Sequence, residues 1–339
     1  MKLLVTGGAG FIGSEFVRMT LRTHPEDEVV VLDKLTYAGN RANLAPVESD
    51  ARFRFVQGDI ADRDLVNDLA GTVDVIVNFA AESHVDRSLE SPGQFIQTDV
   101  HGVYVLLEAA RSSRHARFLQ VSTDEVYGDV TTGRSVETDL LSPRSPYSAS
   151  KAGGELLIWS YRTSYGFPAI ITRGSNTYGQ YQFPEKIIPL FITNAIDDRP
   201  LPIYGNGQAV RDYLFVEDHC SGIDTALRKG SPGENYNVGI GTEINGITVA
   251  DTILRLLGKP DALKEHVRDR LGHDQRYAID TAKLRGLGWE PSVTFEEGMK
   301  RTVDWYVANE EWWRPLKSRD FWEFYERNYR PQDEPVSKG

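Results

Sequence analysis

The stretch TGGAGFIGS, residues 6–14, decides the fold. It follows a short apolar run and places Gly7, Gly10 and Gly13 immediately before a segment with helical periodicity. Glycines at this spacing let the backbone approach a pyrophosphate, and the N-terminus of the next helix offers free N–H groups and a positive dipole end. Asp33 closes the second apolar run, twenty positions after Gly13, where an acid can bond ribose hydroxyls. The stretch therefore predicts a dinucleotide-binding turn.

Two acids that follow apolar runs bear on which dinucleotide binds. A carboxylate at Asp33 can accept hydrogen bonds from two ribose hydroxyls and repels a 2′-phosphate, so we expect NAD rather than NADP. Asp59 follows the third apolar run, within Gly58-Asp59-Ile60, and this segment is placed to meet the adenine edge. A role in forming the turn explains Asp59 equally well.

The first half of the chain alternates apolar runs with amphipathic stretches. Near-continuous apolar strands separated by helices predict a parallel sheet covered on both faces. Right-handed crossovers then give an α/β fold, a Rossmann-type doubly wound parallel sheet. The expected strands are 2–7, 28–33, 52–59, 73–80, 117–122 and 169–176, and the expected helices are 11–23, 63–69, 98–114, 248–257 and 294–309.

The pattern loosens after about residue 165. The stretches QYQFPEKIIPLF, RPLPIYGNGQ and KGSPGENYNVGIGTE carry Pro, Gly and Asn, which is typical of loops over a binding site. We expect an NAD-binding domain over 1–165, to which later segments return. We expect a smaller C-terminal substrate-binding subdomain over 166–330, with an aromatic-rich docked helical tail, and a frayed end over 331–339.

Composition bounds the class of protein. The chain has 339 residues, a net charge of −11 and no apolar run long enough to span a membrane. The acidic balance argues against nucleic acid or an anionic membrane as the main partner. The single cysteine, Cys220, excludes a disulfide framework within the chain; with no signal-peptide pattern at the N-terminus, we expect a cytoplasmic location. The absence of His-Glu-x-x-His and Gly-x-Ser-x-Gly motifs argues against a metal or serine hydrolase.

Two further motifs carry chemistry. STDEVYG, residues 122–128, contains adjacent carboxylates, Asp124 and Glu125, where an apolar run ends, and a turn explains one acid better than two. Tyr147 and Lys151 lie four residues apart at the start of a helical pattern and so project from one face. A Tyr hydroxyl has a pKa near ~10, too high for a base at neutral pH. A nearby ammonium and a cationic nicotinamide ring predict a lower pKa, and hence hydride-transfer machinery.

Together these motifs resemble a known family. TGGAGFIG, NFAAESHVDRS, STDEVYG, YSASK and QFPEKIIP are similar to the extended short-chain dehydrogenase/reductases, and most of all to the dTDP-glucose 4,6-dehydratases. The resemblance runs from Lys2 to about Lys317. The Thr-Asp-Glu triplet is its most diagnostic part, because related nucleotide-sugar epimerases and decarboxylases generally lack the Asp-Glu pair.

The resemblance implies a hydro-lyase of deoxysugar biosynthesis. Such an enzyme retains NAD, oxidises dTDP-glucose at C4, removes water across C5 and C6 and returns the hydride to C6, giving dTDP-4-keto-6-deoxyglucose. Tyr147 would take the proton from the 4-hydroxyl, beside Lys151. Glu125 would remove the C5 proton, Asp124 would protonate O6, and Thr123 would hydrogen-bond O4. Two carboxylates in unlike environments can divide the labour in this way.

The resemblance also implies binding residues, and no metal ligand among them. Arg211 is the favoured phosphate ligand, because a guanidinium forks onto phosphate oxygens; an ion pair with Asp212 is the alternative. His84 is either a sugar contact or a structural histidine. The implied NAD residues are Gly7, Gly10, Phe11, Ile12, Gly13, Asp33, Lys34, Thr36, Asp59, Ile60, Ala80, Ala81, Ser83, Thr98, Tyr147 and Lys151. The implied substrate residues are His84, Thr123, Asn176, Lys186, Pro202, Tyr204, Arg211 and His273.

The chain departs from the family pattern at Thr177, Gln180, Gly246 and Leu271. Thr177 stands where a second Asn is frequent, so it bears on the nicotinamide contact. The other three departures fall on the nucleotide side, so the reaction type is better specified than the base or sugar. The alternatives are a nucleotide-sugar 4-epimerase, a 4,6-dehydratase for a UDP- or CDP-linked sugar, or a non-catalytic NAD-sensing protein. The resemblance also implies a homodimer through helices that include the one bearing Tyr147.

Overall fold

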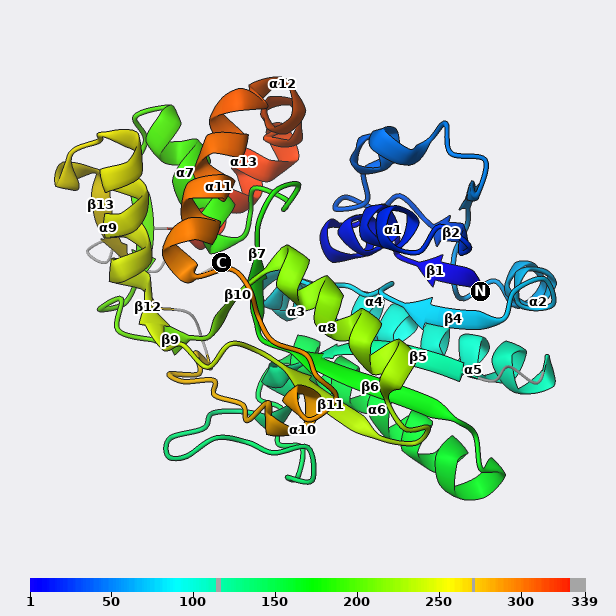
Figure 1. Ribbon diagram of the computed structural model, residues 1–339. Helices are drawn as coiled ribbons and strands as arrows, with labels where there is room; N and C mark the ends of the chain where they lie inside the picture. The colour runs from blue at the N-terminus through cyan, green and yellow to red at the C-terminus, as the bar shows by residue number, and fades with distance from the viewer. Residues whose placement is uncertain (114–116, 270–271, 330–339) are drawn as a thin grey trace.

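A seven-stranded parallel sheet forms the centre of the computed structural model, which describes residues 1–113, 117–269 and 272–329 (Figure 1). The strand order is β11-β6-β5-β4-β1-β2-β3, and every neighbouring pair is parallel. The predicted Rossmann-type doubly wound fold is therefore confirmed. The strands are β1 (Lys2–Thr6), β2 (Glu28–Asp33), β3 (Phe53–Gln57), β4 (Val75–Asn78), β5 (Arg117–Thr123), β6 (Ala169–Gly174) and β11 (Asn235–Val238).

Helices cover both faces of the sheet, and each face has its own hydrophobic cluster. Side chains alternate between the faces, as the period of a strand requires: Leu3 and Val31 pack on one face, Leu4 and Leu32 on the other. The first face is covered by α1 (Phe11–Thr23), α8 (Val216–Lys229) and α10 (Ala282–Arg285). The second is covered by α2 (Arg63–Ala70), α5 (Val103–Ser112) and α6 (Pro146–Tyr165).

Most connections are short helical turns or small two-stranded pairs. The turns are η1 (Arg41–Val47), α3 (Val85–Glu90), α4 (Pro92–Phe95), the π-helical η2 (Ile96–Gly102), η3 (Asp124–Tyr127) and η4 (Asp261–Leu263). The pairs are β7 (Asn176–Tyr178) with β10 (Tyr213–Phe215), β9 (Val210–Arg211) with β12 (Ile244–Asn245), and β8 (Leu201–Tyr204) with β13 (Lys264–Val267).

A third hydrophobic cluster lies beside the sheet, where Figure 1 shows the C-terminal helices gathered together. It contains residues of α7 (Ile187–Ile196), α9 (Gly246–Leu257), α11 (Phe295–Ala308), α12 (Glu310–Trp313) and α13 (Arg319–Asn328), with η5 (Arg314–Leu316) between the last two. Trp313 and Phe321 are buried in it, so the aromatic C-terminal stretch is docked as expected. The domain boundary at residue 165 stays a prediction, and the end over 331–339 lies outside the described residues.

Two kinds of expectation were wrong. The three stretches interpreted as loops contain α7, β8 and β11, because their Pro and Gly residues lie around these elements or at tolerated positions within them. β11 is specified by its long-range partner β6, which a local pattern cannot reveal. The helix expected over 98–114 is divided into η2 and α5.

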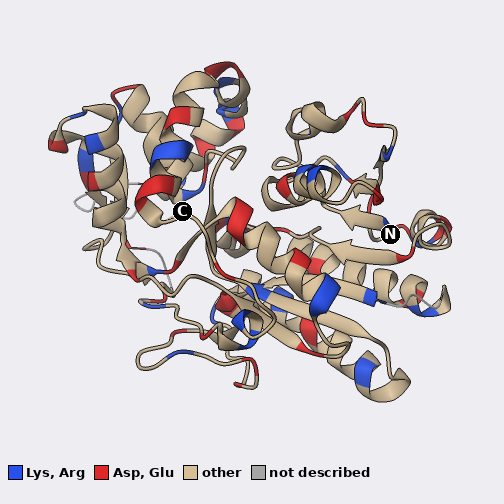
Figure 2. Ribbon diagram, in the orientation of Figure 1, with Lys and Arg blue, Asp and Glu red and all other residues tan. Residues whose placement is uncertain are grey.

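Charges and membrane segments add two findings. Figure 2 shows basic and acidic residues interspersed on the helices of both parts of the ribbon, without a continuous stretch of one sign. In the part of the chain that the structure describes, no helix is both long and apolar enough to cross a bilayer.

Candidate active site

The glycine-rich turn joins β1 to α1 and lines one end of a pocket. Gly7 has φ +68°, and a Cβ atom on it would lie 2.5 Å from the backbone nitrogen of Ala80. A Cβ atom on Gly13 would overlap the carbonyl oxygen of Gly7. Because Gly10 caps α1 without a side-chain hydrogen bond, the first N–H groups of the helix are left to an anion. The turn therefore fits a pyrophosphate.

Asp33 lies at the end of β2 on the wall of the same pocket. Its carboxylate accepts hydrogen bonds from the backbone N–H groups of Ala9 (2.9 Å) and Leu35 (2.8 Å). Burial raises the pKa of Asp33, and these two hydrogen bonds oppose the rise. Asp59 accepts from the N–H of Ala61 and pairs with Lys34 at 2.6 Å, so it both forms the turn and lines the pocket.

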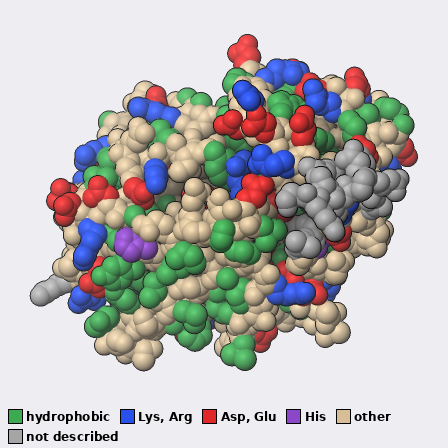
Figure 3. Space-filling view, turned by 180° about the vertical axis from the view of Figure 1, so that it is seen from behind, with side chains coloured by type: hydrophobic (Ala, Val, Ile, Leu, Met, Phe, Trp, Pro, Cys, Tyr) green, Lys and Arg blue, Asp and Glu red, His purple; other side chains and the backbone are tan. Residues whose placement is uncertain are grey.

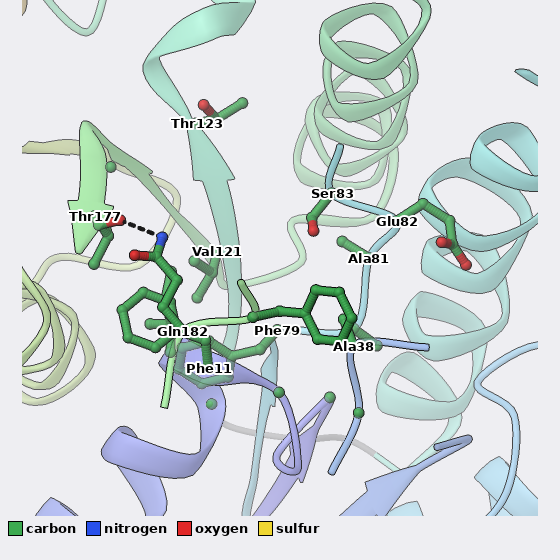
Figure 4. A pocket seen from close by; sticks show the side chains of 18 of the residues that line it. Phe11, Ala38, Phe79, Ala81, Glu82, Ser83, Val121, Thr123, Thr177 and Gln182 are labelled. Atoms are coloured by element: carbon green, nitrogen blue, oxygen red, sulfur yellow. Dashed lines mark hydrogen bonds between the residues drawn. The ribbon is translucent and has the colours of Figure 1, made fainter. Parts of the chain in front are cut away.

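Every residue predicted to bind the cofactor lines this one pocket, which continues from the glycine-rich turn to Tyr147 and Lys151. Figure 4 shows Phe11, Phe79 and Ala38 near one end of the view and Thr123 at the other. The close backbone approach at Gly7 and the acid at Asp33 fit a dinucleotide with free ribose hydroxyls. The individual binding roles stay predictions.

The two adjacent acids occupy different environments after β5. Asp124 is 2 % exposed, and its Oδ2 has no hydrogen-bond partner among the described residues. Burial, followed by the negative charges of Glu125 and Asp212, raises the pKa of Asp124 well above its usual value. Glu125 lines the pocket, and Asp124 is absent from the lining. Burial and the neighbouring negative charges therefore favour the protonated form of Asp124, beside an acid that faces the pocket.

Thr123 links these acids to Tyr147. Its hydroxyl accepts a hydrogen bond from the N–H of Glu125 at 3.2 Å, which caps η3, and lies 3.3 Å from Oδ1 of Asp124. A hydrogen bond with Thr123 also lowers the pKa of Tyr147 in part. One hydroxyl at the end of β5 thus touches all three groups to which we assign proton transfers.

The lowered pKa expected for Tyr147 includes the effect of a bound cationic nicotinamide ring and stays a prediction. Burial raises the pKa of Tyr147 well above 10, and the charges of Glu125 and Asp99 raise it further. Lys151 donates from Nζ to the carbonyl oxygen of Val121 at 2.9 Å. Its own pKa is lowered by burial, which Asp99 and Glu155 oppose. The protein side chains by themselves therefore favour the protonated phenol of Tyr147.

The residues assigned to the substrate separate into two groups. Thr123, Asn176 and Lys186 line the pocket, and Lys186 donates from Nζ to the carbonyl of Ser83. Pro202, Tyr204, Arg211, His273 and His84 are not part of that lining. The lining does not follow the predicted division, because Lys186, expected on the nucleotide side, lines the pocket and His84, expected at the sugar, does not.

Tyr204 marks the second group. Its ring lies 6.1 Å from that of His273, and its hydroxyl donates to Asp86 at 3.0 Å. His84 is buried against Phe324, with ring centroids 5.5 Å apart, and burial lowers its pKa. These contacts favour the structural interpretation of His84, and its contact with the sugar stays a prediction.

Arg211 does not form the ion pair considered for it. The carboxylate of Asp212 accepts instead from the N–H groups of residues 240–242, and Arg211 donates to the carbonyl oxygens of Val210 and Asp274 at 2.8 Å each. Its guanidinium lies 4.3 Å from the ring centroid of Tyr277. Because the Tyr277 hydroxyl lies 3.5 Å from Glu125, Arg211 stands close to the acids of η3.

The structure shows local contacts at three of the four positions where the chain departs from the family pattern. Asn245 caps α9 by accepting from the N–H of Thr248 at 2.8 Å, which leaves Gly246 as the first helical residue. Gln180 donates to Glu217 at 3.4 Å. Leu271 lies outside the described residues. Thr177 lies 2.7 Å from Nδ1 of His219.

His219 is a pocket residue that the sequence did not reveal. The Thr177 hydroxyl donates to the carbonyl of Ser175 at 3.1 Å, so it accepts from Nδ1 of His219 and leaves Nε2 as an acceptor. Burial lowers the pKa of His219 to about 4, so the ring is neutral. Glu82, Gln182 and Glu185 also line the pocket and were missed, because no motif spacing marks them. Among the described residues, no cluster of three His, Cys, Asp or Glu side chains is placed to hold a metal ion.

Comparison with known proteins identifies the family. Residues 4–302 match the family model described as GDP-mannose 4,6 dehydratase, and the chain belongs to this family of NAD-dependent, extended short-chain dehydrogenase/reductases. It is 50% identical to a dTDP-glucose 4,6-dehydratase of Streptomyces niveus, over 94% of this chain and 97% of that protein. It is 51% identical to the low-salt glycan biosynthesis protein Agl12 of Haloferax volcanii, over 92% of this chain and 100% of that protein.

Solved structures of proteins similar to this chain agree with this family assignment. The dTDP-glucose 4,6-dehydratase DesIV of Streptomyces venezuelae, solved with NAD and dTDP bound, superposes with a TM-score of 0.92 at 50% identity, over 94% of this chain and 100% of that chain. The UDP-glucose 4-epimerase of Thermus thermophilus, solved with NAD, has a TM-score of 0.83 at 32% identity, over 91% of this chain and 100% of that chain. The dehydratase is thus the more similar of the two classes.

Proposed function

We propose that this protein is an NAD-retaining dTDP-glucose 4,6-dehydratase. Relatives with this name share about half of their residues with it over more than nine tenths of its length. The observation that carries the proposal is the pair of acids after β5, one buried with a raised pKa and one on the pocket wall. A 4-epimerase has no step that needs both an acid and a base at C5 and C6.

Each side chain then has a task in proton transfer. Bound NAD supplies the hydride acceptor for C4 and the hydride donor for C6, and its cationic ring provides the positive charge that Tyr147 needs. Tyr147 removes the proton from the 4-hydroxyl, and Thr123 hydrogen-bonds the same oxygen. The 4-ketone makes the C5 proton acidic, and Glu125 removes it. Asp124, protonated in its buried position, gives its proton to the leaving O6 as water departs.

Lys151 and the glycine-rich turn hold and orient the dinucleotide and Tyr147 but take no part in proton transfer. Lys151 is fixed by its hydrogen bond to Val121 and keeps a positive charge near Tyr147. Gly7 and Gly13 allow the pyrophosphate to approach the backbone, and Asp33 accepts from the ribose hydroxyls. These assignments rest on the pocket lining and on the family relationship.

The deciding experiment uses dTDP-glucose carrying deuterium at C4. We expect the 4-keto-6-deoxy product with that deuterium at C6, and slower turnover of glucose linked to UDP, CDP or GDP. A galactose epimer as the sole product, or a C6 position without label, would defeat the proposal.

We further propose a homodimer. Leu89, Ile96, Leu156 and Trp159 are hydrophobic side chains between 44 and 60 % exposed, on α3, η2 and α6. Figure 3, seen from behind, shows hydrophobic side chains gathered on the lower part of that face. A patch of this kind is typical of an interface. Light scattering should give twice the chain mass for the wild type and a lower mass for Leu156→Glu; a monomeric wild type would overturn the proposal.

A cytoplasmic location is also proposed. Cys220 is a buried free thiol, which agrees with a reducing compartment. Cell fractionation tests this directly, and recovery of the protein outside the cytoplasmic fraction would contradict it.

A further inference from the structure

Arg87, on α3, contacts three segments that lie far from it in the sequence, those of Tyr37, Glu185 and Phe324. These three segments and α3 carry four different colours in Figure 1. Its guanidinium carbon lies 4.0 Å from the ring centroid of Tyr37 and 4.6 Å from that of Phe324. Its Nε donates to Oε2 of Glu185 at 2.8 Å. Two aromatic rings and the carboxylate of Glu185 therefore contact this one guanidinium group.

Two of these segments form walls of the pocket. Thr36, Ala38 and Gly39, on either side of Tyr37, line it next to the ribose-binding acid Asp33. Glu185 lines the other wall, together with residues 182, 183 and 186–188. The two walls also meet directly, since the rings of Tyr37 and Phe183 are 5.4 Å apart in a T-shaped arrangement. Arg87 itself is not part of the lining, so its effect on a ligand acts through the walls.

The charges in this cluster are strongly coupled because they are removed from water. The side chain of Glu185 is 2 % exposed and that of Arg87 is 29 % exposed. Burial raises the pKa of Glu185, but the charges of His84, Arg87 and Lys186 outweigh it and hold that pKa below its usual value. A buried ion pair with this environment is rigid, and loss of one partner is costly to the other.

We propose that Arg87 is a positioning residue that fastens the Tyr37 wall to the Glu185 wall and thereby keeps the dinucleotide in its pocket between turnovers. This inference rests on the proposed function, in which NAD is regenerated in each cycle and has no need to leave. The dinucleotide can depart only when the walls separate, and separation breaks the contact of Arg87 with Tyr37. Loosening that contact should speed release of NAD without removing any residue that touches the sugar.

The test measures dissociation of radiolabelled NAD from the holoenzyme, chased with excess unlabelled NAD and with no sugar nucleotide present. Tyr37→Leu removes the ring and should speed release about tenfold, the effect of losing one cation–π contact and one ring–ring contact. Tyr37→Phe keeps the ring and loses only the hydroxyl, which interacts with Glu185, so it should release NAD more slowly than Tyr37→Leu. Arg87→Met should be at least as fast as Tyr37→Leu.

Arg314→Met is the matched control for an arginine substitution. Arg314 pairs with Glu310 at 2.6 Å and lies 4.5 Å from the ring centroid of Trp313, but none of these residues lines the pocket. It should leave the release rate unchanged. Wild-type release from Arg87→Met would overturn the inference. If Arg87→Met fails to fold, the Tyr37 variants still test whether the contacts of this ring hold NAD. Wild-type release from Tyr37→Leu would overturn the inference, whereas a wild-type protein that binds no NAD would overturn the proposed function itself.

Discussion

Replacement of Asp99 by asparagine should change the stability of the protein in a pH-dependent way. Asp99 lies in η2 and is 2 % exposed; it accepts from the Ser150 hydroxyl at 2.6 Å and from the N–H of Glu82 at 3.2 Å. Burial raises its pKa from 3.8 to about 6, against the opposing charge of Lys151 and these hydrogen bonds. The charge of Glu82 raises it slightly further.

The sign follows from where the proton is bound. Below pH ~4, Asp99 is protonated in both the folded and the unfolded chain, so it adds no pH-dependent cost. Between pH ~4 and ~6 the unfolded chain loses this proton and the folded protein keeps it, so folding becomes less favourable. Two pKa units correspond to about 3 kcal/mol, a cost that is complete above pH ~6. Asparagine removes this cost but gives up one hydrogen-bond acceptor, worth about 1 kcal/mol.

Asp99→Asn should therefore be less stable than the wild type by about 1 kcal/mol near pH 4 and more stable by about 2 kcal/mol at pH 8. Urea unfolding at pH 4.5, 6 and 8, with equal NAD content in both proteins, measures the difference. Asp68→Asn, an exposed change on α2, is the control and should show no such crossover. A constant difference between Asp99→Asn and the wild type at all three pH values would refute the reasoning.

Three further changes probe the site and its supports. Asp124→Asn should slow turnover by about 10²–10⁴-fold yet keep exchange of the C5 proton into heavy water, whereas Glu125→Gln should abolish that exchange; loss of exchange in both would contradict the division of roles. Lys317 is buried with its pKa lowered to about 7, so its contribution to stability falls as the pH drops from ~10.5 towards 7. In urea unfolding, the stability of Lys317→Met relative to the wild type should therefore be about 4 kcal/mol more favourable at pH 7 than at pH 10.5, and an equal difference at both pH values would refute it. Gly13→Ala should weaken NAD binding in calorimetry, because the added methyl group meets a backbone carbonyl. Gly93→Ala is the control and should bind NAD as the wild type does, because a methyl group there meets open space. Equal NAD affinities of the two variants would contradict the proposed role of the glycine-rich turn.

The sheet was predictable because its signals are local. Six of its seven strands are apolar runs whose ends fall within three residues of the expected positions, and α1 begins and ends where its pattern does. The sequence did not predict β11, because its segment NYNV contains two asparagines and its burial depends on partners that are distant in the sequence. Asn237, for example, donates to the carbonyls of Ser135 (3.1 Å) and Asp280 (3.0 Å), contacts that no local pattern contains.

The site was predictable to the extent that strand ends define it. Parallel strands bring their carboxyl ends to one edge of the sheet, so Asp33, Thr123 and Tyr147 meet there with the glycine-rich turn. Tyr204 and His273 come instead from the smaller part of the chain. Their positions depend on how that part packs on the sheet, which spacing along the sequence does not specify.

Neighbouring acids acquire opposite properties because of the short helix on which they lie. In a 3₁₀-helix successive side chains point about 120° apart, so the turn that begins at Asp124 directs that residue inward and Glu125 to the pocket wall. Thr123 caps the turn and fixes this orientation. The sequence predicts that two carboxylates must differ, since the chemistry needs one donor and one acceptor. Which of them is buried is a consequence of η3, and the raised pKa of Asp124 supports the proposal that it is the donor.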